Sequence, residues 1–310
     1  MSAPEESRKN DRASEAVVPG PGARRPVVVG LEPDPGRRMA LAWAADAAAR
    51  RRLPLRTVHA EGVPTRGYRG REVPPSWEGW NDELHKAGRQ VLDEAVDFVM
   101  ARHPEVEVDA VLAEGDPVWV LREQSRDATA VVLGSRHLSR AQEVFGSASI
   151  AIPVMAHAQC PVVVVPEPEH TPREPAYYVV GVDGSEHSAA AVDVAFEEAA
   201  LHGAGLRALC AWETGPLRIF DEYAPQEEAR RLLSETVAGR QARYPEVALH
   251  HELVVGHPVQ VLAEASADAL GLVVGTRGRG GFTGMLLGSV SQGVLHHARC
   301  PVIAVPSRPA

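Results

Sequence analysis

Short apolar runs rich in β-branched residues alternate along this chain with longer segments whose apolar residues recur at helical spacing. In the C-terminal part, the apolar runs predict strands at 177–183, 206–212, 248–255, 271–275 and 302–305. The segments between them predict helices near 187–202, 222–242, 257–268 and 288–297. Continuously apolar strands that alternate with helices are typical of parallel sheets covered on both faces.

The N-terminal part repeats this alternation. It predicts a helix over 81–102 and strands near 26–31, 55–60, 107–113, 130–134 and 162–165. Residues 115–136 align without a gap on residues 256–277, with twelve of twenty-two positions identical. A repeat of this length indicates two copies of one structural unit. We therefore predict an α/β protein of two tandem Rossmann-like open sheets, each of five mostly parallel strands with helices on both faces.

The domain boundaries follow from the repeat and from local composition. Residues 1–24 mix charges with Ser, Pro and Gly and predict a disordered tail. The first half spans 25–167, the proline-rich segment 168–176 is a linker, and the second half spans 177–310.

Composition and charge limit the classes of partner. The formal charge of −9 gives no basic face for nucleic acid. No apolar run is long enough for a membrane span, and we expect a cytoplasmic protein without membrane contact. Cys160, Cys210 and Cys300 form no CxxC pair and are interpreted as buried thiols, with a disulfide between the halves as the less favoured alternative.

A glycine-rich segment carries the clearest functional signal. Gly275 and Gly278 directly follow the strand at 271–275, and after nine further residues Gly288 and Ser289 open a helix. A strand that leads through such a loop into a helix directs backbone N–H groups at phosphate, and Val290 and Ser291 continue the first helical turn. The alternative is a long connection without a ligand.

Further candidates end neighbouring strands, where open α/β sheets bind their ligands. Val182 and Asp183 end the strand at 177–183, and Asp183 can accept hydrogen bonds from a ribose or base. An N-cap or Asx turn before the next helix explains this aspartate equally well. Ala211 offers backbone to a flat ring, and Arg277 and Arg279 add positive charge beside the glycine loop.

The spacing G-x2-G-x9-G-[ST] and the opening VVGVDGSEHS at 179–188 resemble the universal stress protein family in its tandem form. The resemblance covers residues 25 to 306. It implies that Asp183 contacts adenosine and that Ala211 offers backbone to adenine. It further implies an ATP phosphate cradle formed by Gly275, Gly278, Gly288, Ser289, Val290 and Ser291.

The first half departs from this pattern. Glu32 replaces the aspartate and Pro33 follows it, His137 replaces the second glycine, and eight residues separate His137 from Gly146. A side chain in place of glycine fills space that phosphate needs. The first half is therefore expected to be a structural partner for the second.

The sequence favours a binding protein over an enzyme. The glycine-rich segment contains no residue that could act as a base to activate water. No catalytic residue is therefore assigned, and hydrolysis of ATP is expected to be slow at most. The pairs His250-His251 and His296-His297 lack ligand spacing, so no protein metal site is assigned, and Mg²⁺ is expected only as a companion of ATP.

We therefore expect a stress-response regulator that binds ATP in its second half and acts on an unidentified protein partner. The alternatives are a slow ATP hydrolase or nucleotidyl-transfer enzyme, and an interaction module that binds no nucleotide. Monomer and homodimer both remain open.

Overall fold

The computed structural model describes residues 24–33, 38–61, 77–135, 150–167, 170–213, 223–279 and 287–307. Residues 1–23 of the tail predicted at 1–24 lie outside these ranges, as do His137 and Gly146. All ten predicted strands are present, and most of their bounds agree with the sequence pattern to within a residue.

The first half contains five strands and four α-helices among its described residues. In chain order they are β1 (Val27–Gly30), α1 (Met39–Arg51), β2 (Leu55–Glu61), α2 (Trp77–Arg102), β3 (Val108–Glu114), α3 (Pro117–Gln124), β4 (Ala130–Gly134), α4 (Ala151–His157) and β5 (Val162–Val165).

The second half repeats this order with one additional short helix. Its elements are β6 (Tyr177–Gly181), α5 (Glu186–His202), β7 (Gly205–Trp212), α6 (Tyr223–Val237), α7 (Arg240–Arg243), β8 (Leu249–Val255), α8 (Pro258–Ala265), β9 (Gly271–Gly275), α9 (Ser289–His297) and β10 (Val302–Val305). The helix predicted over 222–242 is interrupted because Gly239, with φ +79°, adopts the left-handed conformation between α6 and α7.

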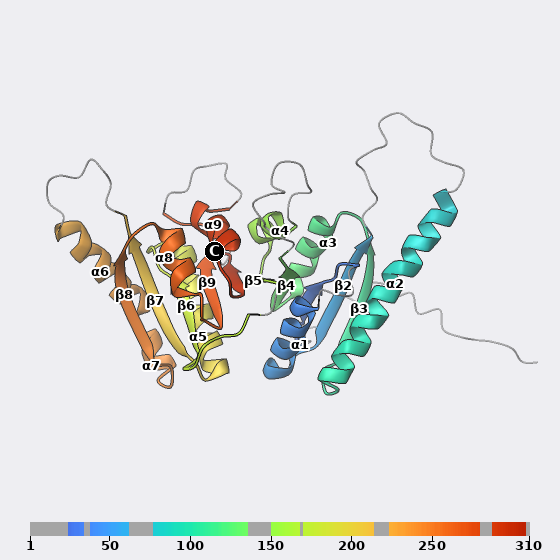
Figure 1. Cartoon of the computed structure of the whole chain (residues 1–310), viewed down its shortest axis with the longest axis horizontal. Coiled ribbons are helices and arrows are strands. Elements are labelled where there is room, and N and C mark those ends of the chain that lie inside the picture. The colour runs from blue at the N-terminus through green and yellow to red at the C-terminus, as the bar shows by residue number, and fades with distance from the viewer. Residues whose placement is uncertain are drawn as a thin grey trace, which may run out of the picture.

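The two predicted five-stranded sheets are present, and they join into one ten-stranded sheet (Figure 1). The strand order is β3-β2-β1-β4-β5-β10-β9-β6-β7-β8. Every neighbouring pair is parallel except β5 and β10, which run antiparallel with Val163 opposite Ile303. The two halves are thus related by an approximate twofold axis at this junction.

Helices cover both faces of the sheet, as the continuous apolar strands predict. One buried cluster lies between the sheet and helices α1, α2, α5 and α6, and the other lies between the sheet and α3, α4, α8 and α9. Both clusters contain residues of both halves, so the core continues across the junction. Among the helices that the structure describes, none combines the length and apolarity that crossing a bilayer requires.

Candidate functional site

A cavity of about 480 Å³ opens at the carboxyl ends of β6, β7 and β9, on the face covered by α8 and α9. All ten residues singled out from the sequence line it: Val182, Asp183, Ala211, Gly275, Arg277, Gly278, Gly288, Ser289, Val290 and Ser291. The carboxyl ends of adjacent parallel strands meet at one sheet edge, which explains why residues so distant in sequence converge here.

Asp183 links the first strand of this half to the glycine loop. Its Oδ1 accepts hydrogen bonds from the Ser185 backbone N–H at 2.9 Å and from the Ser185 hydroxyl at 2.7 Å. Its Oδ2 accepts from the Arg279 backbone N–H at 3.1 Å. The Asx turn that the sequence suggested is therefore present. The second carboxylate oxygen is hydrogen-bonded to the glycine loop. Ser185, and not Asp183, is the N-cap of α5.

The amino end of α9 forms the opposite wall. Gly288 is its N-cap and offers no side chain, so the first N–H groups of the helix remain directed toward the cavity. The Ser291 hydroxyl donates to the Gly275 carbonyl at 2.6 Å and is buried. Of the two predicted serines, only Ser289 therefore has a hydroxyl that makes no hydrogen bond with the described residues.

Two arginines flank the glycines at the mouth of the cavity. Arg277 and Arg279 are both exposed. Burial lowers the pKa of His187 at the start of α5, and the nearby Arg277 charge lowers it further. This imidazole is thus neutral near pH 7, and the two arginines supply the positive charge. Such a mouth favours an anionic ligand.

The cavity also has an apolar wall that the motif did not reveal. It is formed by Leu209, Pro258, Leu262, Val274 and Leu287. A flat apolar ring fits against such a surface. Pro258 and Leu262 lie in the repeated segment, so the alignment of the two halves was the available signal for them. Asp183 is the single carboxylate in the described lining, and no group of three His, Cys, Asp or Glu in the described ranges could hold a metal ion.

The corresponding cavity in the first half is smaller, at about 170 Å³. It is lined by Glu32 and Pro33 where the second half has Asp183 and Gly184. Helices α4 and α9 end at equivalent histidines, and counting back from them places Ala151 at the position of Ser291. Ala151 has no hydroxyl, so it cannot hold α4 to the end of β4 as the Ser291 hydroxyl holds α9 to Gly275.

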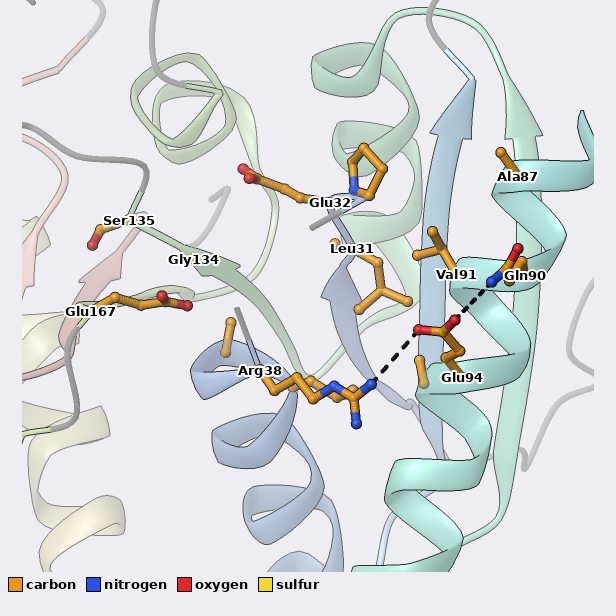
Figure 2. Close-up of a pocket in the computed structure, with 15 residues that line it drawn as sticks. Leu31, Glu32, Arg38, Ala87, Gln90, Val91, Glu94, Gly134, Ser135 and Glu167 are labelled. Atoms are coloured by element: carbon orange, nitrogen blue, oxygen red, sulfur yellow. Dashed lines mark hydrogen bonds and ion pairs between the residues drawn. The ribbon is translucent and has the colours of Figure 1, made fainter. Parts of the chain in front are cut away.

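A different cavity of about 250 Å³ lies in the first half, on the face covered by α1 and α2 (Figure 2). Glu94 accepts a hydrogen bond from Gln90 at 3.0 Å and lies 3.7 Å from Arg38, while Glu167 lies across the cavity. Val91 forms part of its apolar wall.

The second half fills the corresponding space. Leu232 packs so closely against Gly184 that a β-carbon on this glycine would lie 2.5 Å from the leucine side chain. The counterpart of Gly184 in the first half is Pro33. Counting back from the shared sequence Pro-Glu-Val at 104–106 and 245–247 places the shorter Val91 at the position of Leu232. The cavity is therefore a packing difference between the halves.

We predict that Val91→Leu raises the free energy of unfolding by up to about 0.8 kcal/mol, because one more methylene is buried without displacing another group. The reverse change, Leu232→Val, is expected to lower it by about 1 kcal/mol. Urea denaturation of both variants measures the difference. A destabilised Val91→Leu protein would show that this space is already filled.

The three cysteines are free and buried, which confirms the interpretation from sequence. Burial raises the pKa of Cys160 to about 12 and that of Cys300 to about 11. Both thiols are therefore protonated at neutral pH and chemically inert.

Comparison with known proteins agrees with this architecture. The model of the universal stress protein family matches the chain twice, at residues 23–166 and 178–306. Universal stress protein Rv2005c of Mycobacterium tuberculosis is 37% identical over 297 residues, covering 91% of this chain and 97% of the relative. Universal stress protein Rv2623 of the same organism is 35% identical, with coverages of 89% and 95%.

A solved structure supports the same fold. A universal stress protein from Archaeoglobus fulgidus has a TM-score of 0.69 and 18% identity, covering 92% of this chain and 97% of that one. The chain belongs to the universal stress protein family, in the form that carries two family domains in tandem.

Proposed function

We propose that the second half binds ATP and that the chain acts in the cytoplasm as a nucleotide-dependent regulator of the stress response. The observation that carries this proposal is the convergence of the ten predicted residues on one cavity with an apolar wall and a positive mouth. Leu209, Ala211 and Leu262 offer a surface for adenine. The amino end of α9, with Arg277 beside it, offers N–H groups and charge for phosphates.

Regulation fits this lining better than rapid catalysis does. Asp183 uses both carboxylate oxygens in hydrogen bonds to its own chain, so it is a poor base for activating water. Mg²⁺, if it accompanies ATP, would take its ligands mainly from the phosphates and water. We infer that bound ATP changes the surface that an unidentified protein partner contacts, which requires that partner to prefer one nucleotide state.

Titration calorimetry of the full chain with ATP and Mg²⁺ tests the proposal. We expect one site per chain, because the first half has the smaller cavity and carries Glu32, Pro33 and His137 at the positions of Asp183, Gly184 and Gly278. Mass spectrometry of small molecules that copurify provides an independent check. Absence of binding heat and of copurified nucleotide favours an interaction module, and two equivalent sites contradict the asymmetry. Turnover above about one per second favours an enzyme.

A further inference from the structure

We propose that the buried ion pair between Arg51 and Glu198 selects which surfaces meet at the centre of the sheet, so that each half accepts the other half and rejects a second copy of itself. Arg51 ends α1 in the first half, and Glu198 lies in α5 of the second half. The pair therefore crosses the junction between the halves.

The strands at the junction carry little selectivity of their own. β5 consists of four valines, and β10 reads Val-Ile-Ala-Val. All eight side chains are buried and apolar. Either edge can pair with a second copy of itself about as well as with the other, so discrimination must come from the helices beside them.

Arg51 and Glu198 form a buried ion pair between the helices beside these strands. The Arg51 Nη2 donates to the Glu198 Oε1, and their side chains are only 20% and 7% exposed. Among the described residues, the Arg51 Nη1 and the Glu198 Oε2 are buried without a hydrogen bond. A buried ion pair with unsatisfied polar atoms adds little to the free energy of unfolding. Stability alone therefore does not explain why this pair lies at the junction.

The surrounding groups do not replace the guanidinium. The His202 Nδ1 lies 2.9 Å from the Glu198 carbonyl and 3.8 Å from its Oε2, and the Tyr178 hydroxyl lies 3.3 Å from the same nitrogen. Burial lowers the pKa of His202, so the ring is neutral and donates to the carbonyl. Arg50 is the other cation nearby, and Glu197 adds negative charge. Among the described residues, only Arg51 donates a hydrogen bond to the Glu198 carboxylate.

The two helices can be aligned through their ends. Arg52 and Gly203 terminate α1 and α5 in the same left-handed conformation, with equivalent hydrogen bonds to the preceding turn. Counting back from them places Arg51 at the position of His202, and Ala47 at the position of Glu198. Each half therefore carries only one member of the pair.

This distribution penalises the pairing of like halves across the approximate twofold axis. Two first halves would bring Arg51 against Ala47 and bury two guanidiniums near the axis without a carboxylate. Two second halves would bring Glu198 against a neutral His202 and bury two carboxylates without a guanidinium. An unpaired buried charge costs several kcal/mol, so only the unlike pairing is free of this penalty.

The test uses Ile303→Cys in the full chain as a reporter. Residue 303 faces Val163 in the native junction but would face residue 303 of a second chain if two second halves paired. A disulfide-linked dimer therefore reports like pairing. The protein is unfolded and then refolded at a chain concentration of about 0.5 mM, in a buffer that allows thiol exchange. This is near the effective concentration that a short linker gives the two halves of one chain, so pairing between chains can compete with pairing within a chain.

We expect the neutral pair Arg51→Met with Glu198→Met to increase the covalent dimer at least about fivefold over the native pair, because the charge penalty is gone. The reversed pair Arg51→Glu with Glu198→Arg is the matched control and should remain at the native level. The same variants without Ile303→Cys measure how much disulfide-linked dimer the three native cysteines form.

Stability provides a second readout. Arg51→Met alone leaves Glu198 buried without its partner, and we expect its Tm to fall by about 5 °C or more, with the neutral pair recovering most of this loss. If the Met pair does not fold, Arg51→Gln with Glu198→Gln takes its place. Equal dimer yields from the native and neutral pairs would overturn the proposal, as would a neutral pair that melts no higher than the single variant.

Discussion

Gly278→Val is expected to abolish the rise in Tm that ATP gives the full chain while changing the nucleotide-free Tm little. A β-carbon at residue 278 would lie 2.4 Å from the Asp183 Oδ2, which is the oxygen that accepts from the Arg279 N–H. The conflict is with the end of a side chain, which can rotate away. The folded state is therefore kept, while the space beside the loop is lost.

The size of the expected effect follows from ligand linkage. ATP at a hundredfold excess over its Kd stabilises the protein by about 2.7 kcal/mol, and a variant that cannot bind forfeits all of it. Thermal melts with and without ATP and Mg²⁺ measure this shift. The matched control is His137→Val, at the sequence position in the first half that corresponds to Gly278, and it should retain the native shift.

The outcome also tests whether the glycine loop holds the phosphates and which half binds ATP. If Gly278→Val kept the full ATP shift, the glycine loop would not hold the phosphates. If both variants lost the shift equally, the two halves would contribute jointly to binding, and the proposed asymmetry would be wrong.

The sequence predicted the elements because each half obeys local rules. The valine runs at 27–30, 162–165 and 271–275 are apolar at every position, which identifies strands buried on both faces. The glycine spacing located the candidate cavity because parallel strands bring their carboxyl ends to one edge.

The features that the sequence did not predict depend on contacts between distant segments. Periodicity does not specify which strand an edge will meet, so the antiparallel junction of β5 with β10 was not predicted. Leu209 and Leu287 line the cavity, yet each reads locally as an ordinary core residue. Arg51 and Glu198 likewise read as solvated helical charges, and only the junction buries them.

Gly275→Ala is expected to have the largest effect on stability of the changes at the candidate site. A β-carbon at residue 275 would lie 2.7 Å from the His187 carbonyl carbon and 2.9 Å from its oxygen. These atoms belong to the backbone at the start of α5, so no side-chain rotation relieves the overlap. We expect a loss of about 3 kcal/mol or more in the free energy of unfolding, at the upper end for overpacked cores.

The same substitution in the first half is the matched control. Gly134 ends β4 as Gly275 ends β9, but the nearest atom to its added β-carbon is the Ala40 Cβ at 3.9 Å, an ordinary contact. Gly134→Ala should therefore change the free energy of unfolding by less than about 0.5 kcal/mol. Urea denaturation of both variants without nucleotide measures the contrast. If both variants lost the same free energy of unfolding, α5 would have moved away from β9 at little cost. Close packing of the end of β9 on α5 would then not explain the glycine at residue 275.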